Sequence, residues 1–130
     1  MNFRIVAATC AAFAFSIAAS AYAAQKLAAA IPNIPGKSLI VGEVDYRPGE
    51  DTPPHTHDKS AFIYAYVISG AIESKVNDGE TRIYHAGEGW SEPPGAIHSI
   101  SRNASKTEPA KLLAIFVVDS DDKPLLTPIK

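Results

Sequence analysis

The sequence predicts an all-β fold, built as a single antiparallel sandwich or barrel. After residue 30, no stretch shows the sustained 3.6-residue periodicity of an amphipathic helix. Instead, short runs rich in β-branched and aromatic residues alternate with turns that contain glycine, proline and an Asp-Gly pair. Seven or more short strands at this spacing are typical of a sandwich or barrel. The 130 residues, 46% hydrophobic and 20% charged, suffice for one domain around one core.

The first 23 residues are predicted to be a secretory signal peptide. Arg4 supplies a positive start, residues 5–18 are uncharged and mostly apolar, and Ala21-Tyr22-Ala23 has the small-x-small pattern that signal peptidase recognises. The expected cut follows Ala23. The apolar run is shorter than the ~20 residues that a membrane helix needs. The protein is therefore expected in the periplasm or outside the cell, with no membrane attachment after cleavage.

Cleavage also changes the charge and the cysteine content. It removes one positive charge, that of Arg4, so the formal net charge falls from −2 by one, to about −3. No Lys/Arg cluster stands out, so nucleic acid is not an expected partner. The only cysteine, Cys10, is lost. The mature chain then has no thiol, which suits an oxidising compartment. Any metal site must therefore be built from histidine, carboxylate and water.

Residues 24–37 are predicted to be a leader segment that lies against the domain. Residues 24–30 could form a short helix or a frayed tail. The two prolines and the glycine of residues 31–36 are incompatible with a regular element.

The barrel domain is predicted over residues 38–130. The residues from 112 to 118 are nearly all apolar, which is typical of a central, buried strand. From Asp119 the tail is polar and contains proline. The expected strands cover residues 38–46, 61–69, 71–76, 81–84, 90–92, 97–102 and 111–118.

A His-x-His pair is the first feature that indicates chemistry. Gly49 is followed by five residues and then by His55-Thr56-His57. Alternate residues of a strand point to the same face, so both imidazoles are expected to aim the same way. One metal ion can bind both rings at ~2.0–2.1 Å.

A second block lies further along the chain. Gly87 is followed by five residues, then by Pro93-x-Gly95, two further residues and His98. Together the two blocks resemble the two signature motifs of the cupin superfamily, and the resemblance extends over residues 38–118. It implies a small antiparallel jelly-roll barrel with a metal inside one mouth.

The resemblance implies three metal ligands, His55, His57 and His98. A site of imidazoles suits one divalent transition metal, with Fe(II) favoured and Mn, Zn, Ni or Cu as alternatives. Three protein ligands leave coordination positions open, which is a catalytic arrangement.

The sequence departs from the family pattern at one ligand. Metal-binding cupins mostly place a glutamate a few residues after the His-x-His pair, and counting back from Gly70 puts Ile63 there. Asp58, the only acid in this segment, is expected to face away from the metal on a regular strand. Glu92 is the candidate replacement, as a ligand, a general base or a hydrogen-bond partner of a ligand histidine. The alternative is a solvated carboxylate at a strand end.

Three functions are compatible with such a site. The first is a metal-dependent oxygenase-type enzyme, such as a dioxygenase, acting on a small organic substrate. The second is a non-catalytic module that binds a metal or a small ligand in the periplasm, and the third is a structural protein with a vestigial site. His85 is expected to be exposed. An outward stripe of Tyr64, Tyr66 and Ile68 suggests a homodimer interface or cover by a second sheet.

Overall fold

The computed structural model describes residues 22–130, which form ten antiparallel β-strands and no helix. The described residues accordingly include no helix that could cross a bilayer. The predicted signal peptide lies outside the described residues, apart from Tyr22 and Ala23. The prediction of an all-β antiparallel barrel is confirmed.

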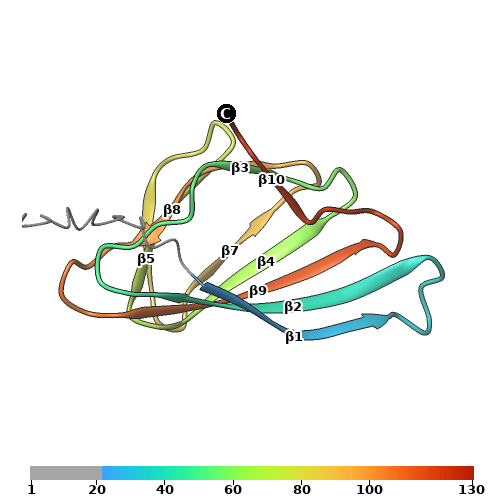
Figure 1. Ribbon diagram of the computed structural model, residues 1–130, viewed down its shortest axis with the longest axis horizontal. Helices are drawn as coiled ribbons and strands as arrows, with labels where there is room; N and C mark the ends of the chain where they lie inside the picture. Colours follow the sequence, from blue (N-terminus) through green and yellow to red (C-terminus); the bar gives the residue numbers. More distant parts are fainter. Residues whose placement is uncertain (1–21) are drawn as a thin grey trace, which may run out of the picture.

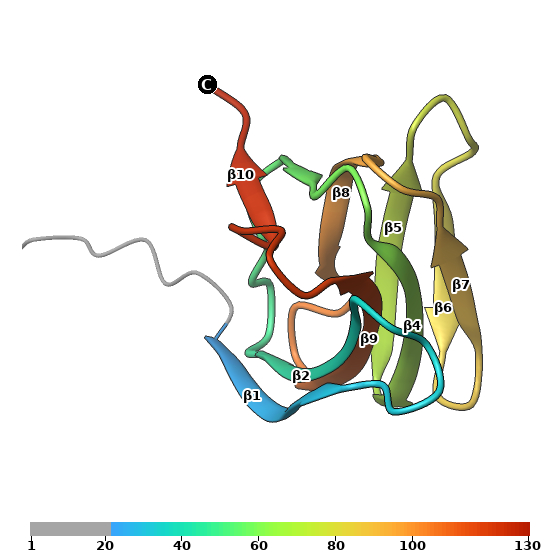
Figure 2. The same ribbon diagram turned by 90° about the vertical axis from the view of Figure 1, so that its right-hand side faces the viewer.

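The strands form two five-stranded sheets that curve around a common interior (Figures 1 and 2). The first sheet has the order β1–β2–β9–β4–β7, with bounds Tyr22–Ala30, Lys37–Tyr46, Ala110–Asp119, Phe62–Ser69 and Gly89–Glu92. The second has the order β10–β3–β8–β5–β6, with bounds Leu126–Pro128, His55–His57, Ile97–Asn103, Ala71–Val76 and Arg82–His85.

The strands expected from the sequence agree with those of the structure to within one residue at each end. β9 holds the apolar run of residues 112–118 and is the middle strand of the first sheet, as predicted. It pairs with β2 over ten residues, from Lys37 opposite Asp119 to Tyr46 opposite Ala110, and with β4 on its other side. This pairing fixes which face of each strand points inward.

Two strands differ from the expectation. Residues 24–30, expected as a short helix or a frayed tail, belong to β1, which pairs with β2 at the edge of the first sheet. Alanine favours a helix in isolation, but hydrogen bonding to a preformed sheet edge outweighs that weak preference. In the tail, β10 pairs with β3 beside the His-x-His segment. Residues 31–36 form turns between β1 and β2, as the prolines and glycine predicted.

The core lies between the sheets and follows the strand alternation. On β4, Ile63, Ala65 and Val67 are at most 2% exposed, whereas Tyr64 and Ile68 on the opposite face are about 40% exposed (42% and 41%). One core cluster packs Val67, Ile72, Trp90 and Leu112 together with neighbouring residues, and a second packs Ala61, Ile63, Phe116 and Val118.

A candidate metal centre

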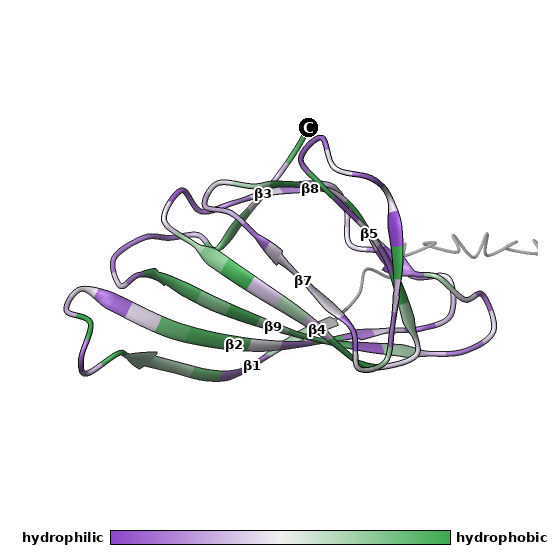
Figure 3. Cartoon of the chain, turned by 180° about the vertical axis from the view of Figure 1, so that it is seen from behind, coloured by the Kyte–Doolittle hydropathy of each residue, from purple (hydrophilic) through white to green (hydrophobic). Residues whose placement is uncertain are grey.

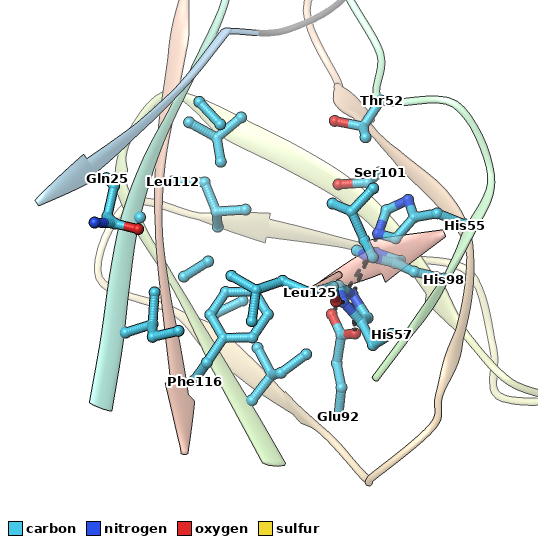
Figure 4. Close-up of a pocket in the computed structure, with 18 of the residues that line it drawn as sticks. Gln25, Thr52, His55, His57, Glu92, His98, Ser101, Leu112, Phe116 and Leu125 are labelled. Carbon is cyan, nitrogen blue, oxygen red and sulfur yellow. Dashed lines mark hydrogen bonds and ion pairs between the residues drawn. The ribbon is translucent and has the colours of Figure 1, made fainter. Parts of the chain in front are cut away.

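The three predicted histidines lie together inside the barrel. β3 carries His55 and His57, and β8 carries His98, which is directly opposite His55 in the strand register. All three side chains are buried, and the candidate ligand nitrogens lie within 4.8 Å of one another. Figure 4 shows the rings converging from β3 and β8. The structure therefore brings together the residues that the two sequence blocks singled out, although their role as ligands stays a prediction.

Local backbone structure aims the histidines. The Pro53 carbonyl accepts a hydrogen bond from His55 Nδ1 at 2.9 Å, and the Leu125 carbonyl accepts one from His57 Nδ1 at 3.3 Å. A carbonyl can only accept, so each of these Nδ1 atoms carries the proton. In the neutral form of each ring, Nε2 then presents a lone pair, and the two Nε2 atoms face each other at 3.2 Å. This is the tautomer that a metal-binding imidazole needs.

Glu92 lies within the same cluster and not at a solvated strand end. Its side chain is 2% exposed; Oε2 is 2.9 Å from His57 Nε2, and Oε1 is 3.3 Å from His98 Nδ1. On β7, Glu92 is directly opposite Ile63 of β4. Opposite residues of an antiparallel pair share a face, with their Cβ atoms about 4.5–5.5 Å apart. The carboxylate thus enters the site from the strand beside the position where the cupin glutamate was expected.

Neighbouring side chains hold the cluster in place. Trp90 Nε1 donates a hydrogen bond of 2.9 Å to Glu92 Oε1, and Ser74 Oγ lies 2.9 Å from His98 Nε2. Trp90 and Ser74 are buried, at 8% and 2% exposed. Groups that orient metal ligands commonly make contacts of this kind. Ser74 could not be identified from the sequence, because its partner His98 lies 24 residues further along the chain.

Burial sets the protonation of the cluster. It lowers the pKa of His55, and it lowers the pKa of His98 to about 4, so both rings are neutral near pH 7. Burial alone would raise the pKa of Glu92, but contacts with His57 and His98 outweigh it and hold that pKa below its usual value. The site therefore offers neutral imidazoles and a carboxylate, which are the forms that bind a cation.

The donor set fits a metal ion. Although Glu92 Oε2 is close to His57 Nε2, it makes no hydrogen bond and is a buried oxygen without a partner. In the neutral ring with its proton on Nδ1, the His57 nitrogen that this oxygen faces carries a lone pair, and the same nitrogen faces His55 Nε2. Two ligands bound to one ion at ~2.1 Å lie about 3.0–3.4 Å apart. The distances from His57 Nε2 to His55 Nε2 and to Glu92 Oε2, 3.2 Å and 2.9 Å, are close to this range. A cation between them would replace a mutual repulsion by bonds.

An elongated cavity of about 350 Å³ opens beside the cluster. One end is formed by the histidines and Glu92, and the walls are mainly apolar (Figure 4). A group of hydroxyls also borders it, with Tyr46 Oη 2.9 Å from both Thr52 Oγ1 and Ser101 Oγ. This group could not be identified from the sequence, because its members lie on separate segments of the chain. The remaining lining residues include Ile40, Val44, Ile63, Ala65, Leu112, Ala114 and Phe116, with Gln25 at the far side.

Other residues considered from the sequence lie outside the cluster. Asp58 is buried beyond the end of β3, but it belongs neither to the metal-ligand group nor to the cavity lining. His85, the last residue of β6, is exposed, as expected, and pairs with Glu88. Phe62 and Tyr64 point outward and do not line the cavity.

Comparisons with known proteins show the family of this chain. The family model described as "Cupin domain" matches residues 42–116. "Germin-like protein subfamily 2 member 2" of Arabidopsis thaliana is 32% identical over 90 residues, which is 66% of this chain and 40% of that protein. "Germin-like protein 1-1" of Oryza sativa subsp. japonica is 31% identical over 96 residues, 68% of this chain and 43% of that protein. The chain thus matches less than half the length of these curated relatives.

Solved structures share the architecture. A recombinant oxalate oxidase in complex with glycolate is 25% identical with a TM-score of 0.59, over 69% of this chain and 45% of that one. An uncharacterized protein with a double-stranded beta-helix domain from Klebsiella pneumoniae has a TM-score of 0.63 at 19% identity, over 85% of both chains. The latter likeness supports the fold alone.

Proposed function

This chain belongs to the cupin family, and we propose that it binds one divalent transition metal and uses it for oxygenase-type chemistry on a small organic substrate. One observation carries the proposal. Three buried atoms with lone pairs, His55 Nε2, His57 Nε2 and Glu92 Oε2, converge with His98 at the end of a cavity. Buried acceptors that face one another without a donor are costly unless a cation joins them.

Each residue of the cluster has a role in this proposal. His55, His57 and His98 would hold the ion, and Glu92 would be the fourth ligand through Oε2 while Trp90 holds Oε1. When bound, a metal such as Fe(II) supplies Lewis acidity and access to dioxygen. The apolar walls exclude water and position the substrate beside the ion. One structural relative, an oxalate oxidase, was solved with glycolate bound, which is in keeping with a small-molecule ligand here.

A periplasmic module that binds a metal or a small ligand without turning it over is the second candidate. It is favoured by Ile63, which stands where most metal-binding cupins have a glutamate, because the usual ligand set is then altered. The two candidates share the metal site and differ only in turnover.

Two further features belong to the proposal. The predicted signal peptide favours a periplasmic or secreted location. The apolar outer face of the first sheet favours a homodimer, because a single chain would leave this face in contact with water.

Metal content tests the site directly. We expect purified protein to bind one equivalent of metal, and we expect His98→Ala to lose most of it, because removal of one of three imidazoles breaks the facial set. Glu92→Gln keeps the shape but removes the charge and one acceptor, and we expect about 10- to 100-fold weaker binding. His85→Ala, which changes an exposed histidine outside the cluster, is the matched control. Unchanged metal content in His98→Ala would refute the site.

Oxygen uptake separates the enzyme from the binding module. The protein is loaded with Fe(II) without oxygen and then mixed with aerated buffer and a panel of catechols, flavonols and thiols. Substrate-dependent oxygen consumption that is lost in His98→Ala supports the enzyme. Stoichiometric metal without consumption on any member of the panel would favour the module.

A further inference from the structure

Among the described residues that line the cavity, no cationic side chain could balance an anionic ligand in addition to the Glu92 carboxylate. Among the described residues that line it, none is lysine or arginine. Apart from the histidines and Glu92, its polar groups are uncharged: the hydroxyls of Tyr46, Thr52 and Ser101 and the amide of Gln25. Ligand imidazoles are neutral and a ligand carboxylate carries one negative charge. A divalent ion held by this set therefore leaves a net charge of one positive unit.

The net charge of one positive unit on the metal and its protein ligands limits the charge of a further ligand that coordinates the ion. A chelating group with one negative charge neutralises it. A small dianion such as oxalate would leave one buried negative charge in an apolar cavity, with no cationic side chain among the described lining residues to pair with it. An unpaired buried charge is strongly unfavourable.

The walls limit the shape of the ligand. Beyond the cluster, the inner face of the first sheet forms an apolar wall of the cavity, where Ile40 and Val44 of β2 lie beside Phe116 and Leu112 of β9. Figure 4 shows Leu112 and Phe116 on this wall. A volume of about 350 Å³ holds about twelve groups of the size of a water molecule. A ligand that consists only of a polar chelating group would leave most of these apolar walls facing water.

We propose that the cavity takes a singly charged oxygen chelator with an apolar body, of the phenol, enol or hydroxy-ketone class, and discriminates against small dicarboxylates. This inference rests on the proposed metal site, because the charge count needs the ion. It sets this chain apart from the oxalate oxidase that it resembles in fold, since the preferred ligand would be larger and less charged than oxalate.

Calorimetric titration of the zinc-loaded protein tests the inference. Zinc does not react with oxygen, so binding is read as heat, without turnover. The probes are tropolone, which chelates as a single anion, its isopropyl derivative, and oxalate. Each affinity is divided by the affinity of the same probe for free Zn(II) in the same buffer. We expect isopropyltropolone to bind about 10- to 50-fold better than tropolone, since each buried CH₂ contributes about a fourfold gain. We expect oxalate to bind at least about tenfold worse than tropolone, because it leaves a buried charge unpaired.

A cavity variant locates the effect. Ala114 lines the apolar wall, so Ala114→Leu should remove the gain from the isopropyl group while zinc and tropolone still bind. Ala104→Leu makes the same change at an exposed position just after β8, away from the cavity and from the outer face of the first sheet, and should leave all three affinities unchanged. The ranking of the probes on the unmodified protein does not depend on either variant.

The outcomes distinguish this inference from the proposed function. Bound zinc with a normalised oxalate affinity equal to or above that of tropolone, or with no gain from the isopropyl group, overturns the ligand class and leaves the metal site standing. Failure to bind zinc overturns the proposed function and the ligand class with it.

Discussion

At the scale of single residues, burial keeps His55 and His98 uncharged, and this makes the stability of the metal-free protein depend on pH. In the metal-free protein, burial lowers the pKa of His98 from 6.5 to about 4, and it also lowers the pKa of His55. Between pH 6.5 and about 4, His98 is protonated in the unfolded chain but not in the folded chain. Since the unfolded state binds more protons, the free energy of unfolding falls as the pH falls from 6.5 towards 4.

We therefore expect the metal-free protein to lose stability over this pH range. A shift of one pKa unit corresponds to about 1.4 kcal/mol, so His98 alone accounts for a loss on the order of 3 kcal/mol. The measurement is urea unfolding of metal-free protein at a series of pH values. His98→Gln, which cannot titrate, should flatten the profile, whereas His85→Gln at an exposed position should leave it as it is. An equally steep profile in His98→Gln would show that other groups are responsible.

At the scale of elements, the corner between β4 and β5 depends on a glycine. Gly70 has a φ of +72°, and a Cβ built there would lie 2.5 Å from the Pro109 carbonyl oxygen and 2.8 Å from Ala110 Cα. The backbone before β9 thus fills the space that any side chain would need. Gly49 has a similar φ of +76°, but no atom lies within 4 Å of such a Cβ.

This pair of glycines separates packing from backbone strain. Gly49→Ala should cost about 1–2 kcal/mol, the penalty of a left-handed conformation. Gly70→Ala adds the clash with residues 109 and 110 and should cost about 1–3 kcal/mol more, as overpacking does. Chemical denaturation of the two variants measures the difference. Equal losses would show that the corner relaxes around the added methyl group.

The strands show where sequence reasoning succeeds and where it stops. Alternation and turn residues placed the main strands to within one residue, because both signals are local. β1 and β10 were missed because each is a strand only by pairing with an edge that distant residues provide. The same limit applied to Glu92. Its place just before Pro93, in an otherwise apolar stretch, suggested a role, but only the pairing of Glu92 with Ile63 of β4 fixes the direction in which it points.

At the scale of the whole molecule, the outer face of the first sheet is apolar across four strands. The register places Tyr64 of β4, Ile115 of β9, Val41 of β2 and Leu27 of β1 in one row. A parallel row holds Phe62, Val117, Leu39 and Ala29. Figure 3 shows hydrophobic segments on these neighbouring strands. Phe62, Tyr64 and Leu27 are 51%, 42% and 43% exposed, so part of this apolar surface faces water in the single chain.

The size of this face is close to the lower end of what a dimer interface buries. Four strands of about 8–10 residues at about 3.3 Å per residue, spaced about 4.8 Å apart, give roughly 500–630 Å². Stable interfaces bury about 1,200–2,000 Å² in total, or about 600–1,000 Å² on each partner. One end of the face carries both signs of charge, with Lys111 3.1 Å from Glu43 and 3.5 Å from Asp45, so a polar rim adjoins the apolar centre. Two such sheets can pack face to face at an angle of about 30°.

We therefore expect the protein to be a dimer in solution, with the cavity of each copy inside its own barrel. Tyr64→Lys places a charge in the centre of the face, where two-fold packing would bring it close to the same lysine of the second copy. We expect this variant to be a monomer, and to stay folded because residue 64 is exposed in the single chain. Ile83→Lys makes a comparable change on β6 of the other sheet, where Ile83 is 52% exposed, and should leave the dimer intact.

Sedimentation velocity at micromolar concentrations measures the oligomeric state of both variants. If the unmodified protein sediments as a monomer, the proposed interface does not exist. If Ile83→Lys breaks the dimer and Tyr64→Lys does not, the interface lies on the other sheet. Because the face and the metal cluster lie on opposite sides of the first sheet, the Tyr64→Lys monomer should bind metal as the dimer does.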